Sequence, residues 1–232
     1  MASIVDSIRS VYTDKFSALK IGVFSYAIYF LVSMYVPSTQ QNPLNMLLIL
    51  FIFFLYSGYC AIIISNRINQ RIEVLPTLDL VKYFRVCVQS FLLSIPFFII
   101  SIFVVGFVLA LFRFEALPQQ IALWLVRFVV FCSFVSALIN YSESFSLRVG
   151  MNISSIINGL ADVIVYTIVC ILLLGIYSIF LAVPTLFLLY TFFKFGPLFQ
   201  YGAAFFLTFN LAFVADYWGQ LHYDIKSRDN YY

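Results

Sequence analysis

A chain of 232 residues that is 63% hydrophobic and only 10% charged cannot hide its apolar side chains in one water-soluble core. Its formal net charge of +3 is small and no basic run is dense, which argues against nucleic acid as a partner. The composition predicts one polytopic membrane domain in which lipid is the solvent for most side chains.

The first element expected is an amphipathic helix over residues 3–17, where apolar side chains recur at helical spacing with polar ones between them. Such a helix can lie on the inner leaflet, or it can pack as a cytosolic helix against the loops of the bundle. No cleavable signal sequence is expected ahead of the first span, because the first eighteen residues carry acids and lack a continuous apolar core.

A helix that crosses a membrane needs about 20 apolar residues, because about 30 Å of hydrocarbon must be spanned at about 1.5 Å per residue. Six stretches of the chain meet this requirement, and Pro96 is expected to kink the third. The predicted spans are residues 18–36, 44–65, 87–112, 121–139, 160–183 and 197–217, followed by a polar cytoplasmic tail over 218–232.

The apolar stretch 184–196 is the main uncertainty in this count. It is shorter than the lower limit of about 17 residues for a crossing helix. We interpret it as a loop that dips into the membrane interface, with Lys194 reaching out to water; a further span is the alternative.

Polar-to-apolar transitions at Lys15, Lys82 and Arg148 recur 67 and 66 residues apart, which suggests three copies of one unit. The expected fold class is therefore all-α, with six transmembrane helices arranged as three hairpins and with amphipathic cytoplasmic interfacial helices. Ten of the 13 lysines and arginines fall on the side of both termini. Because cytoplasmic loops carry the excess of basic residues, both termini are expected on the cytoplasmic side of the cell membrane.

Four polar side chains within or beside the predicted spans are candidates for ligand binding or for contacts between helices: Arg127, Asp162, Asn210 and Asp216. We interpret Arg127 as snorkelling outward or pairing with Glu115, with substrate binding as the alternative. Asp162 and Asp216 are interpreted as interfacial anchors, with a proton relay as the alternative. Asn210 is interpreted as bonding to another helix, with a polar ligand site as the alternative.

No catalytic, cofactor-binding or metal-binding set of residues is expected. His222 follows the last span without a carboxylate or thiolate at metal-ligand spacing, and the four cysteines are far apart and suit packing. The sequence contains no Gly-rich phosphate loop, no HExxH pair and no GxSxG elbow. These features favour a protein that acts without catalysis and without a cofactor.

Three segments resemble the prokaryotic integral-membrane family of unknown function numbered 4013. They are residues 73–82 ahead of the span that contains Pro96, residues 137–146 ahead of a surface helix, and residues 215–222 at the end of the last span. The segment Tyr83-Phe84-Arg85 lacks the glycine that this family carries before its third span. The resemblance implies a prokaryotic cytoplasmic-membrane protein, distantly similar to membrane segments that accompany glycerophosphodiesterases and to small exporters, and it implies no catalytic residues.

The leading hypothesis is a membrane scaffold that binds lipids, another membrane protein or a second copy of itself through an aromatic surface rich in phenylalanine and tyrosine. The alternative is a small transporter or exporter of an amphipathic compound, which predicts a water-reachable path containing Asn210 and Asp216. A third possibility, a lipid-modifying enzyme, would require Asp162, Asp216 and His222 to cluster at one depth.

Overall fold

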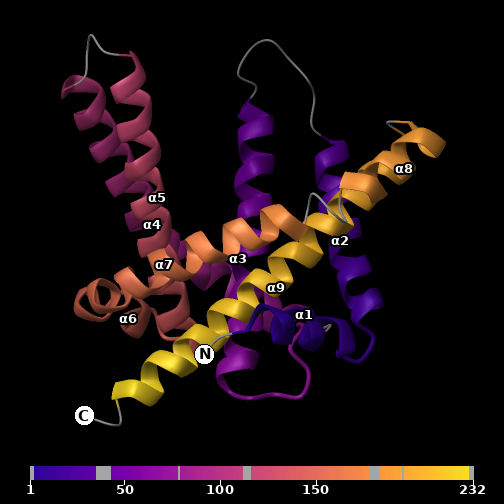
Figure 1. Ribbon diagram of the computed structural model, residues 1–232, viewed down its shortest axis with the longest axis horizontal. Coiled ribbons are helices and arrows are strands. Elements are labelled where there is room, and N and C mark those ends of the chain that lie inside the picture. Colours follow the sequence, from indigo (N-terminus) through magenta and orange to yellow (C-terminus); the bar gives the residue numbers. More distant parts are fainter. Residues whose placement is uncertain are drawn as a thin grey trace.

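A computed structural model describes residues 3–34, 43–77, 79–111, 116–177, 183–194 and 196–229, and these residues form nine α-helices joined by turns and short loops (Figure 1). The helices are α1 (Ile4–Thr13), α2 (Ser17–Ser33), α3 (Pro43–Ile68), α4 (Leu80–Leu111), α5 (Ala116–Ser144), α6 (Leu147–Gly150), α7 (Ile153–Tyr177), α8 (Val183–Phe193) and α9 (Pro197–Asp229).

Five of these helices are long and apolar enough to cross a membrane, namely α3, α4, α5, α7 and α9. The count rises to six if α1 and α2 together form one broken span, since the chain bends by 91° between them. Phe16 makes this corner in the left-handed conformation, with φ of 59°. The predicted all-α class is confirmed for the described residues, and the length and apolar character of these helices agree with the predicted multi-pass membrane protein.

The observed helices differ from the predicted spans mainly at the polar ends. Residue 160 was the predicted start of the fifth span, but α7 begins at Ile153, where the side chain of Asn152 accepts a hydrogen bond from the backbone N–H of Ser155. This side-chain cap starts the helix seven residues earlier. Before the fifth span, the expected surface helix is only the four-residue helix α6. Before the third span there is no separate surface helix in the described residues, because α4 runs without a break from Leu80 through Pro96 to Leu111.

One further prediction on the last third of the chain is wrong. Residues Val183–Phe193 form the helix α8, not a loop, although its 11 residues remain too few for a span. Helix α9 runs on to Asp229, so residues 218–229 of the predicted cytoplasmic tail are helical and continuous with the last span. Within this part, the side chain of Gln220 donates a hydrogen bond to Ser7 of α1.

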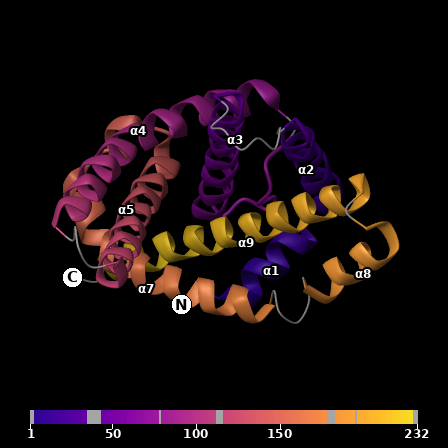
Figure 2. The same cartoon turned by 90° about the horizontal axis from the view of Figure 1, so that it is seen from above.

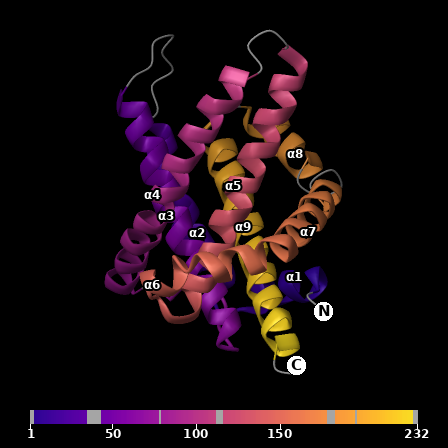
Figure 3. The same ribbon diagram turned by 90° about the vertical axis from the view of Figure 1, so that its left-hand side faces the viewer.

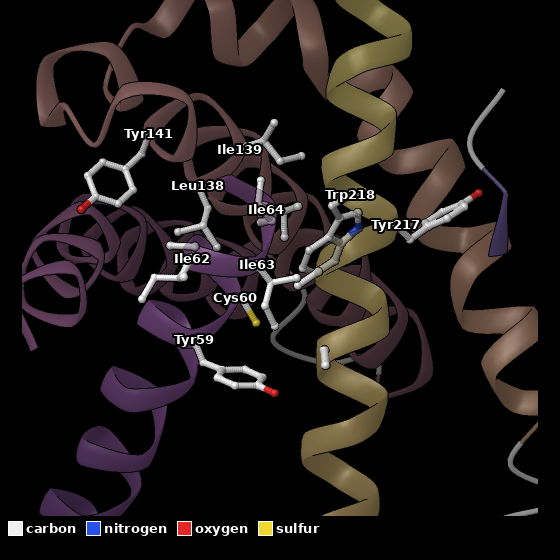
Figure 4. Packing of buried hydrophobic residues seen from close by; sticks show 14 of the residues in the cluster. Tyr59, Cys60, Ile62, Ile63, Ile64, Leu138, Ile139, Tyr141, Tyr217 and Trp218 are labelled. Atoms are coloured by element: carbon white, nitrogen blue, oxygen red, sulfur yellow. The ribbon is translucent and has the colours of Figure 1, made fainter. Parts of the chain in front are cut away.

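The core lies where α3, α5 and α9 meet. Trp218 of α9 lies beside Ile63 and Ile64 of α3, and Tyr217 points to the other side of α9, where its ring contacts that of Tyr166 in α7 (Figure 4). Close backbone approach makes this packing possible: a Cβ added at Gly219 would stand 2.7 Å from the Cβ of Arg67.

The helices are closely packed in only one half of the bundle. Buried residues concentrate in 57–68 of α3, 132–144 of α5 and 208–222 of α9, which we call the converging half. In residues 43–56 of α3, 95–111 of α4 and 118–131 of α5, the splayed half, most side chains are exposed or half-buried. Figure 1 shows α2, α3 and the α4–α5 pair standing apart at the splayed end, with α7 and α9 running obliquely across them.

Both ends of the described chain lie at the converging end of the bundle, near α1 and α6 (Figures 1 and 3). Seen from above, α9 passes along the inside of the molecule, with α2, α3 and α5 on one side and α1 and α7 on the other (Figure 2). The charged and polar groups brought together by this arrangement form the candidate sites.

Candidate functional site: a polar cavity and the charged groups around it

Asp216 lies in the middle of a network that joins α9 to α3 and α1. Its side chain is 0% exposed, and its Oδ1 is 3.6 Å from Nε of Arg67, which is 31% exposed. Its Oδ2 accepts a hydrogen bond from Nε2 of Gln220, one turn further along α9, at 3.0 Å. The predicted anchor at the membrane interface is thus a buried carboxylate whose charge is balanced by an arginine on another helix.

Gln220 extends this network to α1. Its Nε2 also donates to the hydroxyl oxygen of Ser7 at 2.7 Å, and its Oε1 accepts from the backbone N–H of Ser3 at 2.8 Å. Sequence reasoning did not select Gln220, although Asp216 and Gln220 are four residues apart and must share one face of a helix. That spacing is the signal that could have identified the pair.

A second charged group fixes the corner between α1 and α2. Nζ of Lys20 lies 2.7 Å from Oδ1 of Asp14 and 2.8 Å from Oε2 of Glu73. The other oxygen of Asp14 accepts a hydrogen bond from the backbone N–H of Leu75 at 2.8 Å. The loop between α3 and α4 is therefore held against the α1–α2 corner by one lysine and two carboxylates.

One candidate site is a polar cavity of about 720 Å³ between the C-terminal part of α5, α6, the first turns of α7 and His222 of α9. Its lining residues are Ser136, Ile139, Asn140, Glu143, Val149, Asn152, Ser154, Ser155, Asn158, Gly159, Asp162, Val163 and His222. Amide and hydroxyl groups dominate this wall, and its volume falls in the range of about 300–1,000 Å³ that is usual for small-molecule sites.

Two buried nitrogen atoms in this cavity have no hydrogen-bond partner within the described part of the chain: Nδ2 of Asn140 and Nε2 of His222. His222 lies 3.6 Å from a carboxylate oxygen of Glu143, which is within ion-pair distance when the imidazole is protonated. Buried polar atoms normally find a hydrogen-bond partner, so the hydrogen bonding of this wall is incomplete at these two atoms. The wall as a whole can hydrogen-bond to a ligand through both donors and acceptors.

The structure separates the four residues selected from the sequence. Asp162 lines the polar cavity, whereas Asp216 and Asn210 of α9 do not. Arg127 lies in the splayed half of α5, at a smaller, mostly aromatic pocket between α3, α4 and α5. The cluster of Asp162, Asp216 and His222 that a lipid-modifying enzyme would require does not form, because only Asp162 and His222 line the same cavity.

Potential metal ligands do not gather in the described residues, where no group of three or more His, Cys, Asp and Glu side chains has a suitable arrangement. Cys60, Cys87, Cys132 and Cys170 are all buried and outside any disulfide. Their burial agrees with the predicted role in packing.

No protein-family model matches this chain, and no curated protein and no solved structure matches it either. The predicted resemblance to the family numbered 4013 therefore stays a prediction, and the function must be argued from the cavity itself.

Proposed function

We propose that this protein is a non-enzymatic membrane scaffold that binds a lipid and takes the polar headgroup into the polar cavity. The observation that carries this proposal is the cavity of about 720 Å³, walled by amide, hydroxyl and carboxylate groups at the polar ends of apolar helices. A headgroup needs many hydrogen-bonding partners of this kind, and its acyl chains need an apolar surface next to them.

Helix α7 supplies both surfaces. Ser155, Asn158 and Asp162 line the cavity, while Ile153 and Ile157, four residues apart on another side of the same helix, are exposed. Because residues three and four apart share a helix face, the polar and apolar side chains form two adjacent stripes. A lipid can place its headgroup on the first stripe and its chains along the second.

We further propose that the broken α1–α2 pair counts as a span, so that the chain crosses the cell membrane six times as three hairpins with both termini in the cytoplasm. The excess of basic residues on the side of the termini supports this orientation. A cysteine placed in the N-terminal segment of intact cells should resist a membrane-impermeant maleimide and react after permeabilisation. Labelling in intact cells would show that the orientation is the opposite one, with the polar cavity on the outer face.

The lipid-binding function can be tested with one pair of tryptophan substitutions on α7. Asn158→Trp fills the cavity wall, whereas Ile157→Trp adds the same bulk on a neighbouring, exposed position. We expect native mass spectrometry of protein from mixed-lipid nanodiscs to show a bound lipid on the wild type and on Ile157→Trp, and at least a tenfold lower occupancy on Asn158→Trp. Equal occupancy on all three would contradict the proposal.

The same preparation separates a scaffold from an exporter. A scaffold carries no flux, so sealed vesicles containing the protein should retain a fluorescent amphiphile as well as protein-free vesicles do. The exporter predicts a path through Asn210 and Asp216, but Asp216 is fully buried. Flux that depends on the protein and is abolished by Asp216→Asn would contradict the scaffold hypothesis and support the exporter.

A further inference from the structure

Arg127 is a cation within a membrane helix for which the described part of the chain provides neither a hydrogen bond nor an ion pair. It lies nine residues after Pro118, the first residue of the candidate span on α5, which is about 14 Å along the helix axis. That is deeper than the six residues expected from a span starting at residue 121. Lys20 and Arg67, by contrast, each have a carboxylate within 4 Å. An unpaired charge at such depth is unfavourable in lipid and marks a functional site.

Arg127 lines a pocket of about 170 Å³ between α3, α4 and α5, which we call the aromatic pocket. Phenylalanine side chains make most of its wall: Phe53, Phe97, Phe98, Phe131 and Phe134. The rings form edge-to-face and tilted pairs, with centroids 5.4 Å apart for Phe53 and Phe98 and 5.8 Å apart for Phe97 and Phe134. The pocket thus combines one cation with an apolar wall, and it shares no lining residue with the polar cavity.

We propose that the aromatic pocket binds the carboxylate end of a long-chain fatty acid, with the carboxylate on the Arg127 guanidinium. A guanidinium presents two parallel N–H groups that fit the two oxygens of a carboxylate. The pocket is smaller than the roughly 300 Å³ of a typical small-molecule site, so it encloses only the first part of the ligand. The rest of the chain stays in the bilayer beside the splayed helices, and a phosphodiester headgroup with glycerol and two chains is too large for this space.

This second site stands independently of the proposed headgroup cavity, and its test uses the two tryptophans of the chain. Trp124 is exposed and is removed as Trp124→Phe. Trp218 is buried, and its ring centroid lies 6.3 Å from that of Phe131 in the wall of the aromatic pocket. Bromine atoms quench tryptophan fluorescence at short range, so Trp218 reports on an acyl chain that enters the pocket.

The Trp124→Phe protein is placed in vesicles of uncharged phosphatidylcholine and titrated with a dibrominated fatty acid or with its methyl ester. We expect saturable quenching by the acid above the unsaturable background of the ester, which partitions into the bilayer but carries no charge. Arg127→Gln should weaken the saturable component at least tenfold. Arg148→Gln, which removes an exposed arginine of α6 outside the aromatic pocket, should leave it unchanged.

Three results would overturn the proposal: equal quenching by acid and ester, unchanged quenching after Arg127→Gln, or saturable quenching by dibrominated phosphatidylglycerol in place of the fatty acid. The comparison of acid with ester needs no variant at Arg127, so it decides the question even if Arg127→Gln fails to fold. Lipid occupancy of the polar cavity is measured separately, so failure of either site leaves the result on the other intact.

Discussion

The two halves of the bundle differ in whether their charged groups are paired and buried. In the converging half, Asp216 and Arg67 are paired across helices and the surrounding side chains are buried. In the splayed half, apolar side chains face outward and Arg127 lacks a charged partner among the described residues. Packing is therefore dense at one end of the bundle, while the other end exposes apolar side chains and one charge without a partner among the described residues.

The strongest test of this contrast is the substitution Asp216→Asn. It removes the counter-ion of Arg67, and the new NH2 group must face a donor, either Arg67 or Gln220, so we expect a loss of about 3 kcal/mol in unfolding free energy. Arg127→Gln, which removes the charge that has no partner among the described residues of the splayed half, should cost less than about 0.5 kcal/mol. Reversible unfolding in mixed micelles measures both, and equal losses would mean that the two halves do not differ in this way.

Large-to-small substitutions on α4 should show the same contrast along one helix. Leu93 is 1% exposed and Phe103 is 74% exposed. Leu93→Ala leaves a cavity and is expected to cost about 2 kcal/mol, at the low end for core leucines because the unfolded side chain also remains in lipid. Phe103→Ala removes more atoms but should change the unfolding free energy by less than about 0.5 kcal/mol. A larger loss for Phe103→Ala would show that a partner covers the splayed half.

Two glycines, one on α3 and one on α4, allow a comparison in which a single methyl group is added and smaller effects are expected. A Cβ at Gly58 would stand 2.8 Å from the Cα of Cys87, whereas a Cβ at Gly106 meets nothing within 4 Å. We expect Gly58→Ala to destabilise the protein by about 1–2 kcal/mol through overpacking. Gly106→Ala should be neutral or stabilise by up to about 1 kcal/mol, because alanine favours the helix. The difference in thermal midpoint between the two variants checks this directly, and a destabilised Gly106→Ala would contradict it.

The smallest effect is expected from pH at the α1–α2 corner. The hydrogen bond and charge of Lys20 lower the pKa of Glu73 below its ordinary value. The contribution of Glu73 to stability is therefore complete above its unfolded pKa of about 4.3, and it is lost as the pH falls through the lower folded value.

Since Glu73 is 41% exposed, solvent screens this ion pair and its contribution is small. Wild type and Glu73→Gln should differ in thermal midpoint at pH 7 and converge below pH 4, and added salt should shrink the difference at pH 7. If the difference in thermal midpoint persists unchanged at low pH, the effect of Glu73→Gln comes from packing and not from charge.

The membrane class and most helix positions could be predicted because a crossing helix needs a long apolar run, and such runs are visible without any tertiary information. The errors fall where polar residues occur near helix ends. Asn158 lies outside the predicted fifth span and Asp162 lies near its start. In the structure both residues belong to α7 and line the polar cavity. Asp216 is predicted as an interfacial anchor and Gln220 falls in the predicted tail, but their side chains contact Arg67 of α3 and Ser7 of α1.

The four polar residues were selected as candidates for ligand binding or for contacts between helices. Asp216 contacts Arg67 on another helix, as one of these roles predicts, and Arg127 and Asp162 line pockets. Gln220, Arg67 and Glu143 were missed, since nothing in a linear sequence marks which helix ends meet.

The sequence by itself determined that the chain is helical and embedded in lipid, because run length and composition decide the solvent of each segment. Only the tertiary structure decided which charges are paired, where the helices converge and which polar walls enclose a cavity. Those features depend on contacts between segments far apart in the chain, such as Arg67 with Asp216 and Glu143 with His222, and local periodicity carries no information about such pairs.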